Sequence, residues 1–220
     1  MPTEVRLSSP TDIAGFHAQA RQLLAQRIPP ESVQWNAAQG SLEDGAVLPR
    51  AEESRPHAHA RAASSIVPAS FVRLCEYVVQ HRDGDRFALL YRLLWRLVHE
   101  PGLRHDPSDA DMSRAQHMAH AVRRDIHKIK MHLRFQAMSD PERPGELLEM
   151  AWCEPAHHTV ETVAPWFAKR HGASSWALFT PERSVYWDGK QLHYAPGGAP
   201  IASAAAPGEW FARWRAAFAK

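Results

Sequence analysis

The most regular alternation of apolar and polar positions lies between Asp111 and Phe135. At about 100° per residue, its apolar residues fall on one face of a helix: Ala115, Met118, Ala119, Val122, Ile126 and Ile129. A set of polar residues falls on the opposite face: His117, His120, Arg124 and His127. The pattern therefore predicts one amphipathic helix that runs into a strand, with the first set facing the core and the second set facing away from it.

The rest of the first half also predicts mainly helices. One begins at Thr11 or Asp12 and ends near Gln26, before two prolines. The stretch Asp85–Glu100 is the most apolar, and we expect a core helix there with these residues inside: Phe87, Leu90, Tyr91, Leu94, Trp95 and Val98. The remaining elements are a strand at Val5–Ser8, an extended piece at Ser32–Trp35, a flexible loop at about residues 36–66 and a helix at Ala69–His81.

Short apolar runs, which are typical of strands, dominate the second half. They lie at Met131–Met138, Leu147–Cys153, Trp176–Phe179, Val185–Trp187 and Gln191–Tyr194. Asp188-Gly189 predicts a hairpin between the last two. Helices are expected at His157–Arg170 and Gly208–Ala219. The sum predicts an α+β fold in a single domain over residues 1–220, with a helix-rich first half packed on a small, largely antiparallel sheet that has a crossing helix.

Charge changes this picture in one segment. The chain has 26 Lys and Arg against 24 Asp and Glu, a formal net charge of +2, which by itself does not indicate a nucleic-acid partner. Between Arg114 and Arg134, however, there are six Lys or Arg and a single acid, Asp125. A row of cationic and imidazole donors suits a polyanion such as a nucleic-acid backbone. The alternative is a solvated helix face that only keeps the protein soluble.

Three further positions each leave two interpretations open. Asp125 either forms a salt bridge with Arg124 or Lys128, or orients a histidine or arginine toward a substrate. His157 lies where a strand passes into a helix, so backbone N–H groups there favour an anion. It either contacts phosphate or acts as an acid/base, or it only caps and packs the junction. Arg183, in a polar turn, either donates to phosphate or stabilises the turn.

Several kinds of chemistry find no support in the sequence. His117-x-x-His120 and His157-His158 match no recognised zinc pattern, so no metal is expected. No phosphate loop, nucleophile elbow or dinucleotide motif is present, and we expect no cofactor. The eight tryptophans occupy mostly apolar positions and are interpreted as core residues rather than base-stacking platforms. Two cysteines, no apolar signal segment and no membrane-spanning run indicate a cytoplasmic protein that does not enter a membrane.

Four blocks of sequence, taken in order, resemble a bacterial family. They are PASFVRLCEYVVQHRDGDRFALLYRLLWRL (68–97), HAVRRDIHKIKMHLRF (120–135), WCEPAHH (152–158) and SSWALFTPERSVYWDGKQLHYAP (174–196). The family is a domain of unknown function described as a DNA-metabolism protein. It is similar to the N-terminal domain that precedes uracil-DNA glycosylase modules in fusion proteins, and stand-alone members are encoded beside a radical-SAM protein associated with DNA repair or modification.

The resemblance implies a DNA-repair-associated accessory module that binds nucleic acid, chiefly DNA, and works with a glycosylase or radical-SAM partner. The family's basic motif falls on Arg123, Arg124, Asp125, His127, Lys128, Arg134 and Phe135, and its Glu-Pro-x-His element on Glu154, Pro155 and His157. Together with the charge pattern, it predicts a nucleic-acid-binding set of Arg123, Arg124, His127, Lys128, Lys130, Arg134, His157 and Arg183.

Two other classes of function stay open. One is an enzyme that acts on a nucleotide or a damaged base with His127 or His157 as the acid/base, and the other is a pure protein-interaction adaptor. Family members usually continue past the final helix, whereas this chain stops at WFARWRAAFAK. Either the chain is a shortened member or it is one domain of a longer protein, and nothing in it resembles a glycosylase active site.

Overall fold

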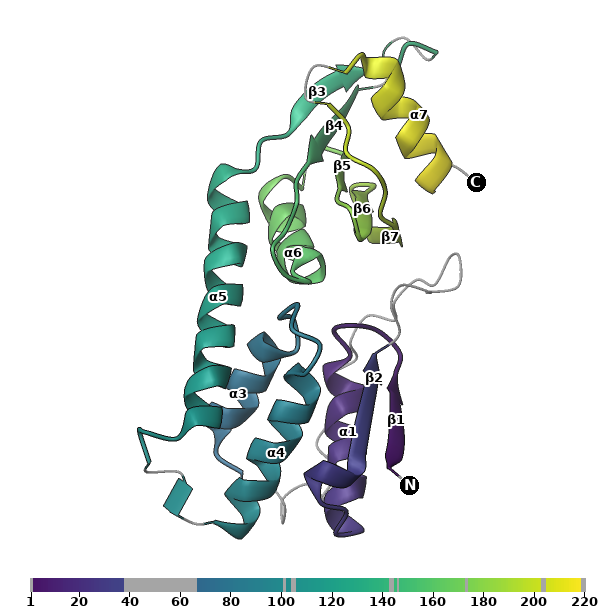
Figure 1. Ribbon diagram of the computed structural model, residues 1–220. Helices are drawn as coiled ribbons and strands as arrows, with labels where there is room; N and C mark the ends of the chain where they lie inside the picture. The colour runs from purple at the N-terminus through teal and green to yellow at the C-terminus, as the bar shows by residue number, and fades with distance from the viewer. Residues whose placement is uncertain are drawn as a thin grey trace. The chain divides into compact units, whose positions relative to one another are not determined.

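The computed structural model describes most of the chain (Figure 1). The described residues are 2–37, 67–100, 102–103, 106–142, 145, 147–172, 174–202 and 205–218. The chain divides into two compact units, Met1–Gln39 with Pro49–Arg123 and Gly40–Leu48 with Arg124–Lys220. Residues within each unit contact one another more than they contact the other unit. This division does not test whether the two units form one domain, so the expectation of a single domain stays a prediction. No helix in the described part of the chain combines the length and apolar character that crossing a bilayer requires.

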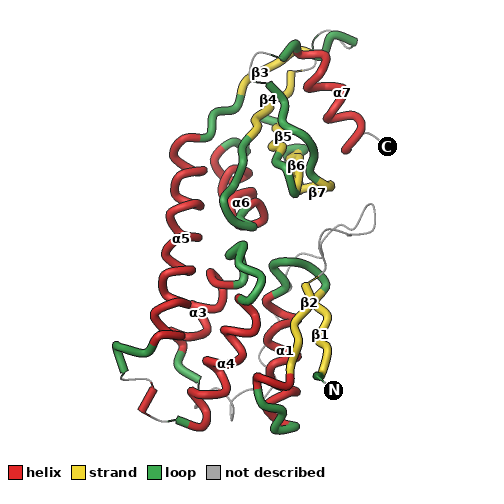
Figure 2. Tube along the Cα trace, in the orientation of Figure 1, coloured by secondary structure: helices red, strands yellow, loops and turns green. Residues whose placement is uncertain are grey.

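The first unit begins with a strand–helix–strand element. Strand β1 (Thr3–Leu7) pairs in parallel with β2 (Val33–Ala37), and helix α1 (Ile13–Ala25) and a 3₁₀ turn (Pro30–Ser32) connect them. Figure 2 shows the two strands side by side with α1 next to them. Parallel strands need such a crossover because a tight turn reverses the chain direction and would make the two strands antiparallel. Residues 36 and 37, which we expected in a loop, extend β2, and residues 38–66 of that loop lie outside the described residues.

Helix α4 (Arg86–His99) is the core helix of the first unit, as predicted. The buried stripe is wider than the sequence pattern indicated, because Leu89, Leu93 and Leu97 are buried as well. Leu94, Trp95 and Val98, which we expected inside, are only half-buried. The unit is completed by α3 (Ala69–Val78) and by α5 (Ala110–His132) through Arg123, and α5 continues into the second unit from Arg124.

A buried arginine ties three segments of the first unit together. The Arg86 side chain donates to the carbonyl oxygens of Val79 at 2.8 Å, Asp83 at 2.9 Å and Pro10 at 2.7 Å. These carbonyls belong to the end of α3, the α3–α4 turn and the β1–α1 loop. Its guanidinium also lies 4.6 Å from the centre of the Phe87 ring. The planar guanidinium satisfies three acceptors in different directions, which a single ammonium group does not do as well.

The second unit is built on a five-stranded sheet in the order β3-β4-β5-β6-β7. The strands are β3 (Gln136–Ser139), β4 (Leu147–Trp152), β5 (Trp176–Phe179), β6 (Arg183–Trp187) and β7 (Leu192–Pro196). Only the β4–β5 pairing is parallel, and helix α6 (Val160–Arg170) makes the crossing between these strands. The predicted α+β class and the largely antiparallel sheet with a crossing helix are therefore confirmed. Met131, expected in a strand, lies in the last turn of α5 instead.

Strand β5 is buried along its whole length because a helix covers each of its faces. Trp176 packs against Phe167 of α6, with ring centres 6.2 Å apart. Phe179 points to the other face and packs against Trp210 of α7 (Pro207–Phe218) at 6.1 Å. Side chains alternate between the faces of a strand, so an uninterrupted apolar run is the pattern expected of a strand covered on both sides.

The predicted hairpin joins β6 and β7 at Asp188-Gly189. Gly189 has a φ of +92°, which a residue without a side chain adopts without strain. The Asp188 carboxylate accepts hydrogen bonds from the backbone of Lys190 and Gln191 and from the His193 ring. Partial burial alone would raise the pKa of Asp188, but these bonds outweigh it and lower the pKa to about 2.

Replacement of Arg86 by leucine is expected to lower the free energy of unfolding by about 3 kcal/mol, because three carbonyl groups lose their donor. Urea unfolding measures this loss. The matched control is Arg73→Leu on the exposed face of α3, which should change stability by less than about 0.5 kcal/mol. Equal effects of the two substitutions would contradict the role assigned to Arg86.

Asp188 is expected to contribute to stability in a defined pH range. Its folded-state pKa lies below the unfolded value of about 4, so the contribution is present above about pH 4 and is lost as the pH falls through about 2. The melting temperatures of wild type and Asp188→Asn should therefore converge between these two pH values. A difference that stays constant over this range would show that the carboxylate charge does not stabilise the hairpin.

Candidate nucleic-acid interface

Helix α5 has the two faces that its sequence predicts. Val122 is fully buried and Ile126 is 8% exposed, whereas His120, Arg124 and His127 are exposed. The helical period thus correctly separated core from surface along the helix. Arg124, His127 and Lys128 lie on the exposed face of the part that belongs to the second unit, and we call these three residues the basic row.

Asp125, the single acid of this segment, points into the second unit. Its carboxylate accepts hydrogen bonds from the backbone N–H of Ala156 at 3.1 Å and of His157 at 3.2 Å, and from the Thr159 hydroxyl at 3.0 Å. These donors precede the first turn of α6, where the helix dipole favours a negative charge. A carboxylate from a neighbouring helix therefore takes the place of a local capping residue.

Neither sequence interpretation of Asp125 matches this arrangement. In the described part of the chain, Asp125 forms no ion pair with Arg124 or Lys128, and its carboxylate is bound by backbone N–H groups and a hydroxyl, not by a histidine or arginine side chain. The expectation that the N–H groups at His157 would be open to an external anion is also wrong, because the Asp125 carboxylate already binds them. No local sequence signal indicates this contact, since the partners of Asp125 lie more than 30 residues away.

The parallel pairing of β4 and β5 brings two polar loops to one edge of the sheet. Residues 153–159 follow β4, and the turn at 180–182 follows β5. The carboxyl ends of parallel neighbours lie at the same edge, and His158 Nδ1 accordingly lies 2.7 Å from Glu182 Oε2. The 153–159 loop is thus held by α5 on one side and by the β5–β6 turn on the other.

Arg183 is engaged inside the second unit. Its Nε lies 3.1 Å from the Glu161 carboxylate of α6, which is an ion-pair distance. Its guanidinium also lies 5.0 Å from the centre of the Tyr194 ring. Thr180 closes the turn by accepting from the Arg183 N–H and donating to its carbonyl. This geometry supports the turn-stabilising interpretation of Arg183, while contact with phosphate stays a prediction.

The remaining basic residues of the segment differ in their surroundings. The Arg123 guanidinium lies 4.7 Å from the centre of the Tyr77 ring, and Lys130 Nζ lies 5.4 Å from that of Trp166. Arg134 donates to two carbonyls at the end of α5. By contrast, no described residue forms a hydrogen bond or ion pair with the side chains of the basic row. The row is therefore available to a ligand without the loss of an existing contact.

Cys153, at the start of the 153–159 loop, is not a nucleophile in this environment. Burial raises the pKa of its thiol to about 12, and the negative charges of Asp125 and Glu154 add to this effect. The thiolate, which is the reactive form, is therefore scarce at neutral pH. Among the described residues, no group of three His, Cys, Asp or Glu side chains is placed to hold a metal ion.

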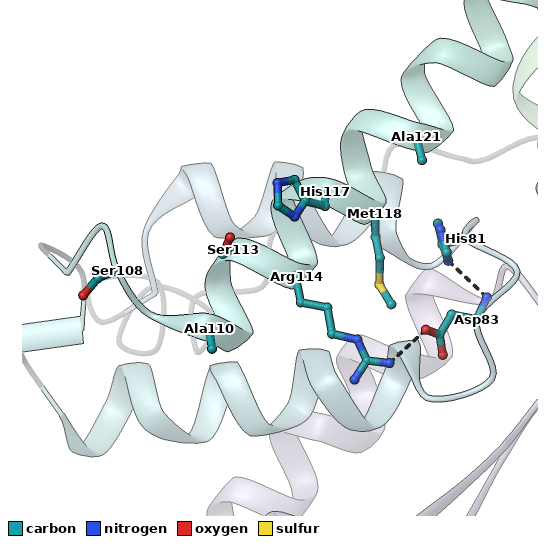
Figure 3. A pocket seen from close by; sticks show the side chains of 9 residues that line it. All are labelled: His81, Asp83, Ser108, Ala110, Ser113, Arg114, His117, Met118 and Ala121. Atoms are coloured by element: carbon teal, nitrogen blue, oxygen red, sulfur yellow. Dashed lines mark hydrogen bonds and ion pairs between the residues drawn. The ribbon is translucent and has the colours of Figure 1, made fainter.

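An open pocket of about 630 Å³ lies in the first unit, away from these residues in the sequence (Figure 3). Figure 3 shows Arg114 and Asp83 directed toward one another across it, with Met118 beside them, and Arg114 Nη2 lies 2.8 Å from Asp83 Oδ2. Partial burial would raise the pKa of Asp83, but the bonds from Arg114 and the Asp85 N–H outweigh it and lower the pKa. The ion pair leaves little net charge at this point, so the pocket is a weaker candidate for a polyanion than the basic row.

The family model of a domain of unknown function, DUF4130, matches residues 84–214. The chain belongs to the DUF4130 family. The match includes α4, α5 and the whole sheet of the second unit, and therefore both Asp125 and its partners in the 153–159 loop. No curated protein and no solved structure shows significant similarity to the chain. Membership of the DUF4130 family assigns no activity, so the functional argument depends on the geometry.

Two residues near the basic row were not among the predicted set. Thr159 completes the binding of Asp125, and Trp166 lies against Lys130 of α5 and Arg170 of its own helix. The threonine gave a sequence signal, because it lies where a helix-capping residue is expected. The Thr159 hydroxyl nevertheless donates to Asp125 and forms no capping hydrogen bond with its own helix.

Substitution of Asp125 by alanine is expected to lower the free energy of unfolding by about 3 kcal/mol, since two backbone N–H groups and a hydroxyl lose a charged acceptor. Thr159→Val should cost about 1 kcal/mol, because it removes a single donor. In a double-mutant cycle measured by urea unfolding, the two changes should be less than additive. Strict additivity would show that the Asp125–Thr159 contact does not stabilise the fold.

Proposed function

We propose that this chain is a DNA-repair-associated accessory module that binds the DNA backbone through the basic row. The supporting observation is the inward orientation of Asp125, the single acid between Arg114 and Arg134. Because its carboxylate is bound inside the second unit, it does not offset the charges of Arg124 and Lys128 on the surface. The exposed face of this part of α5 is therefore cationic although the chain as a whole is nearly neutral.

The chemistry of the row fits phosphate groups better than it fits base edges. Lysine and arginine neutralise phosphates and release the counterions that surround DNA, which favours binding without regard to sequence. His127 adds an exposed imidazole donor to the row. His157 belongs to the loop that Asp125 holds against α5, through a hydrogen bond from its backbone N–H.

In this proposal, the chain supplies binding and a partner supplies chemistry. The sequence resemblance favours a uracil-DNA glycosylase module or a radical-SAM protein as that partner. The same kinds of experiment also test the two alternatives, an enzyme and a protein-interaction adaptor. Turnover of a modified nucleotide by the chain alone would favour an enzyme, and partner binding without DNA binding would favour an adaptor.

The double substitution Arg124→Ala with Lys128→Ala is expected to weaken DNA binding severalfold at low salt. If each residue contacts one phosphate, the slope of log affinity against log salt should decrease by about 2. Fluorescence anisotropy with a labelled oligonucleotide at several salt concentrations measures both quantities.

The matched control removes the same charge elsewhere, by Arg73→Ala with Lys190→Ala, both of which are exposed. The control should leave the affinity and the slope close to those of the wild type. No measurable binding to single- or double-stranded DNA at low salt, or equal losses in the two double variants, would overturn the proposed function.

A further inference from the structure

Trp166 on α6 has two positive charges of the second unit close to its ring. Lys130 Nζ of α5 lies 5.4 Å from the centre of its ring, and the Arg170 guanidinium lies 5.5 Å from the same ring. Phe167 packs edge-on against the indole, with ring centres 5.0 Å apart and planes at 81°. Phe167 thus packs against the indole, and two cations lie near the indole ring.

This tryptophan differs from most of the others in the chain. Five tryptophans have a buried indole nitrogen without a hydrogen-bond partner among the described residues: Trp35, Trp176, Trp187, Trp210 and Trp214. Trp176 and Trp210 are core residues, as the sequence predicted for tryptophans in general. Trp166 is partly buried, as Trp35, Trp187 and Trp214 also are, but its indole nitrogen does not belong to the buried set. The interpretation of all eight as core residues therefore does not extend to Trp166.

An aromatic ring with cations beside it matches the two chemical parts of a nucleotide. A base stacks on an aromatic ring because every base has a π-face, and cations hold the adjoining phosphates. In a duplex, the bases are stacked on one another and their faces are covered. A partly exposed tryptophan with Lys130 and Arg170 close to its ring therefore fits an unpaired nucleotide, whereas a duplex offers it only phosphates.

We infer that Trp166, Lys130 and Arg170 form a stacking site for an unpaired base of a DNA strand. The inference rests on the proposed function, and it adds that the preferred ligand has a single-stranded segment. Arg170 is exposed and Lys130 is half-buried, so Arg170 is the cation that moves from the ring to a phosphate when the base enters. Lys130 lies about 60° around α5 from His127, which places the stacking site beside the basic row.

The first test compares one labelled oligonucleotide as a single strand and as a duplex. The wild type should bind the single strand more tightly. Trp166→Leu should weaken single-strand binding by about 5-fold to 100-fold and leave duplex affinity and its salt dependence unchanged. Trp166→Phe retains an aromatic face and should recover most of the lost affinity. Thermal unfolding of each variant shows whether the fold is retained.

The second test uses the wild-type chain and does not depend on a variant. A single strand that carries 5-bromouracil is cross-linked to the protein by ultraviolet light, and the modified peptide is identified by mass spectrometry. The adduct is expected on the α6 peptide that contains Trp166. An adduct confined to other tryptophans would overturn the inference.

The results separate the two proposals. Equal losses of single-strand and duplex binding in Trp166→Leu, or no loss at all, would overturn the stacking site. The proposed function would still stand in that case if the Arg124 and Lys128 double variant loses binding. Absence of binding to either form by the wild type would overturn both.

Discussion

The contact between Asp125 and the segment Ala156–Thr159 organises the second unit. A carboxylate taken from water needs several donors to replace its hydration, and it finds three here, two of them backbone N–H groups. The bond fixes α5 against the beginning of α6 and determines where the loop after β4 lies. It therefore joins two blocks that are far apart in the sequence, the basic helix and Trp-Cys-Glu-Pro-Ala-His-His, into one piece of structure.

The same contact determines the charge of the surface. A helix face with two cations, Arg124 and Lys128, and one acid would be partly neutralised if the acid lay beside them. Because the Asp125 carboxylate is bound inside, Arg124, His127 and Lys128 face solvent without an acidic neighbour of their own segment. A structural bond in the interior thereby produces a cationic face outside, and this connection supports the proposed role in DNA binding.

The parallel pairing of β4 and β5 determines which loops lie together at one edge of the sheet. In an otherwise antiparallel sheet, this pairing requires a crossing helix and places the loops after both strands at one edge. The His158–Glu182 contact is the direct result. The crossing helix also carries Trp166 toward Lys130 of α5, so the proposed stacking site and the basic row have a common topological origin.

The sequence by itself determined the local features of this protein. The helical period separated Val122 and Ile126 from Arg124 and His127, the run Trp176–Phe179 indicated a strand, and Asp188-Gly189 specified a hairpin. Each follows from spacing within a few residues, because helices and strands repeat over short distances.

Tertiary structure alone decided the partners of Asp125, the engagement of Arg183 with Glu161 and the partial burial of Trp166. These depend on residues between about 20 and 40 positions away, and only the strand order and the helix crossing bring such residues together.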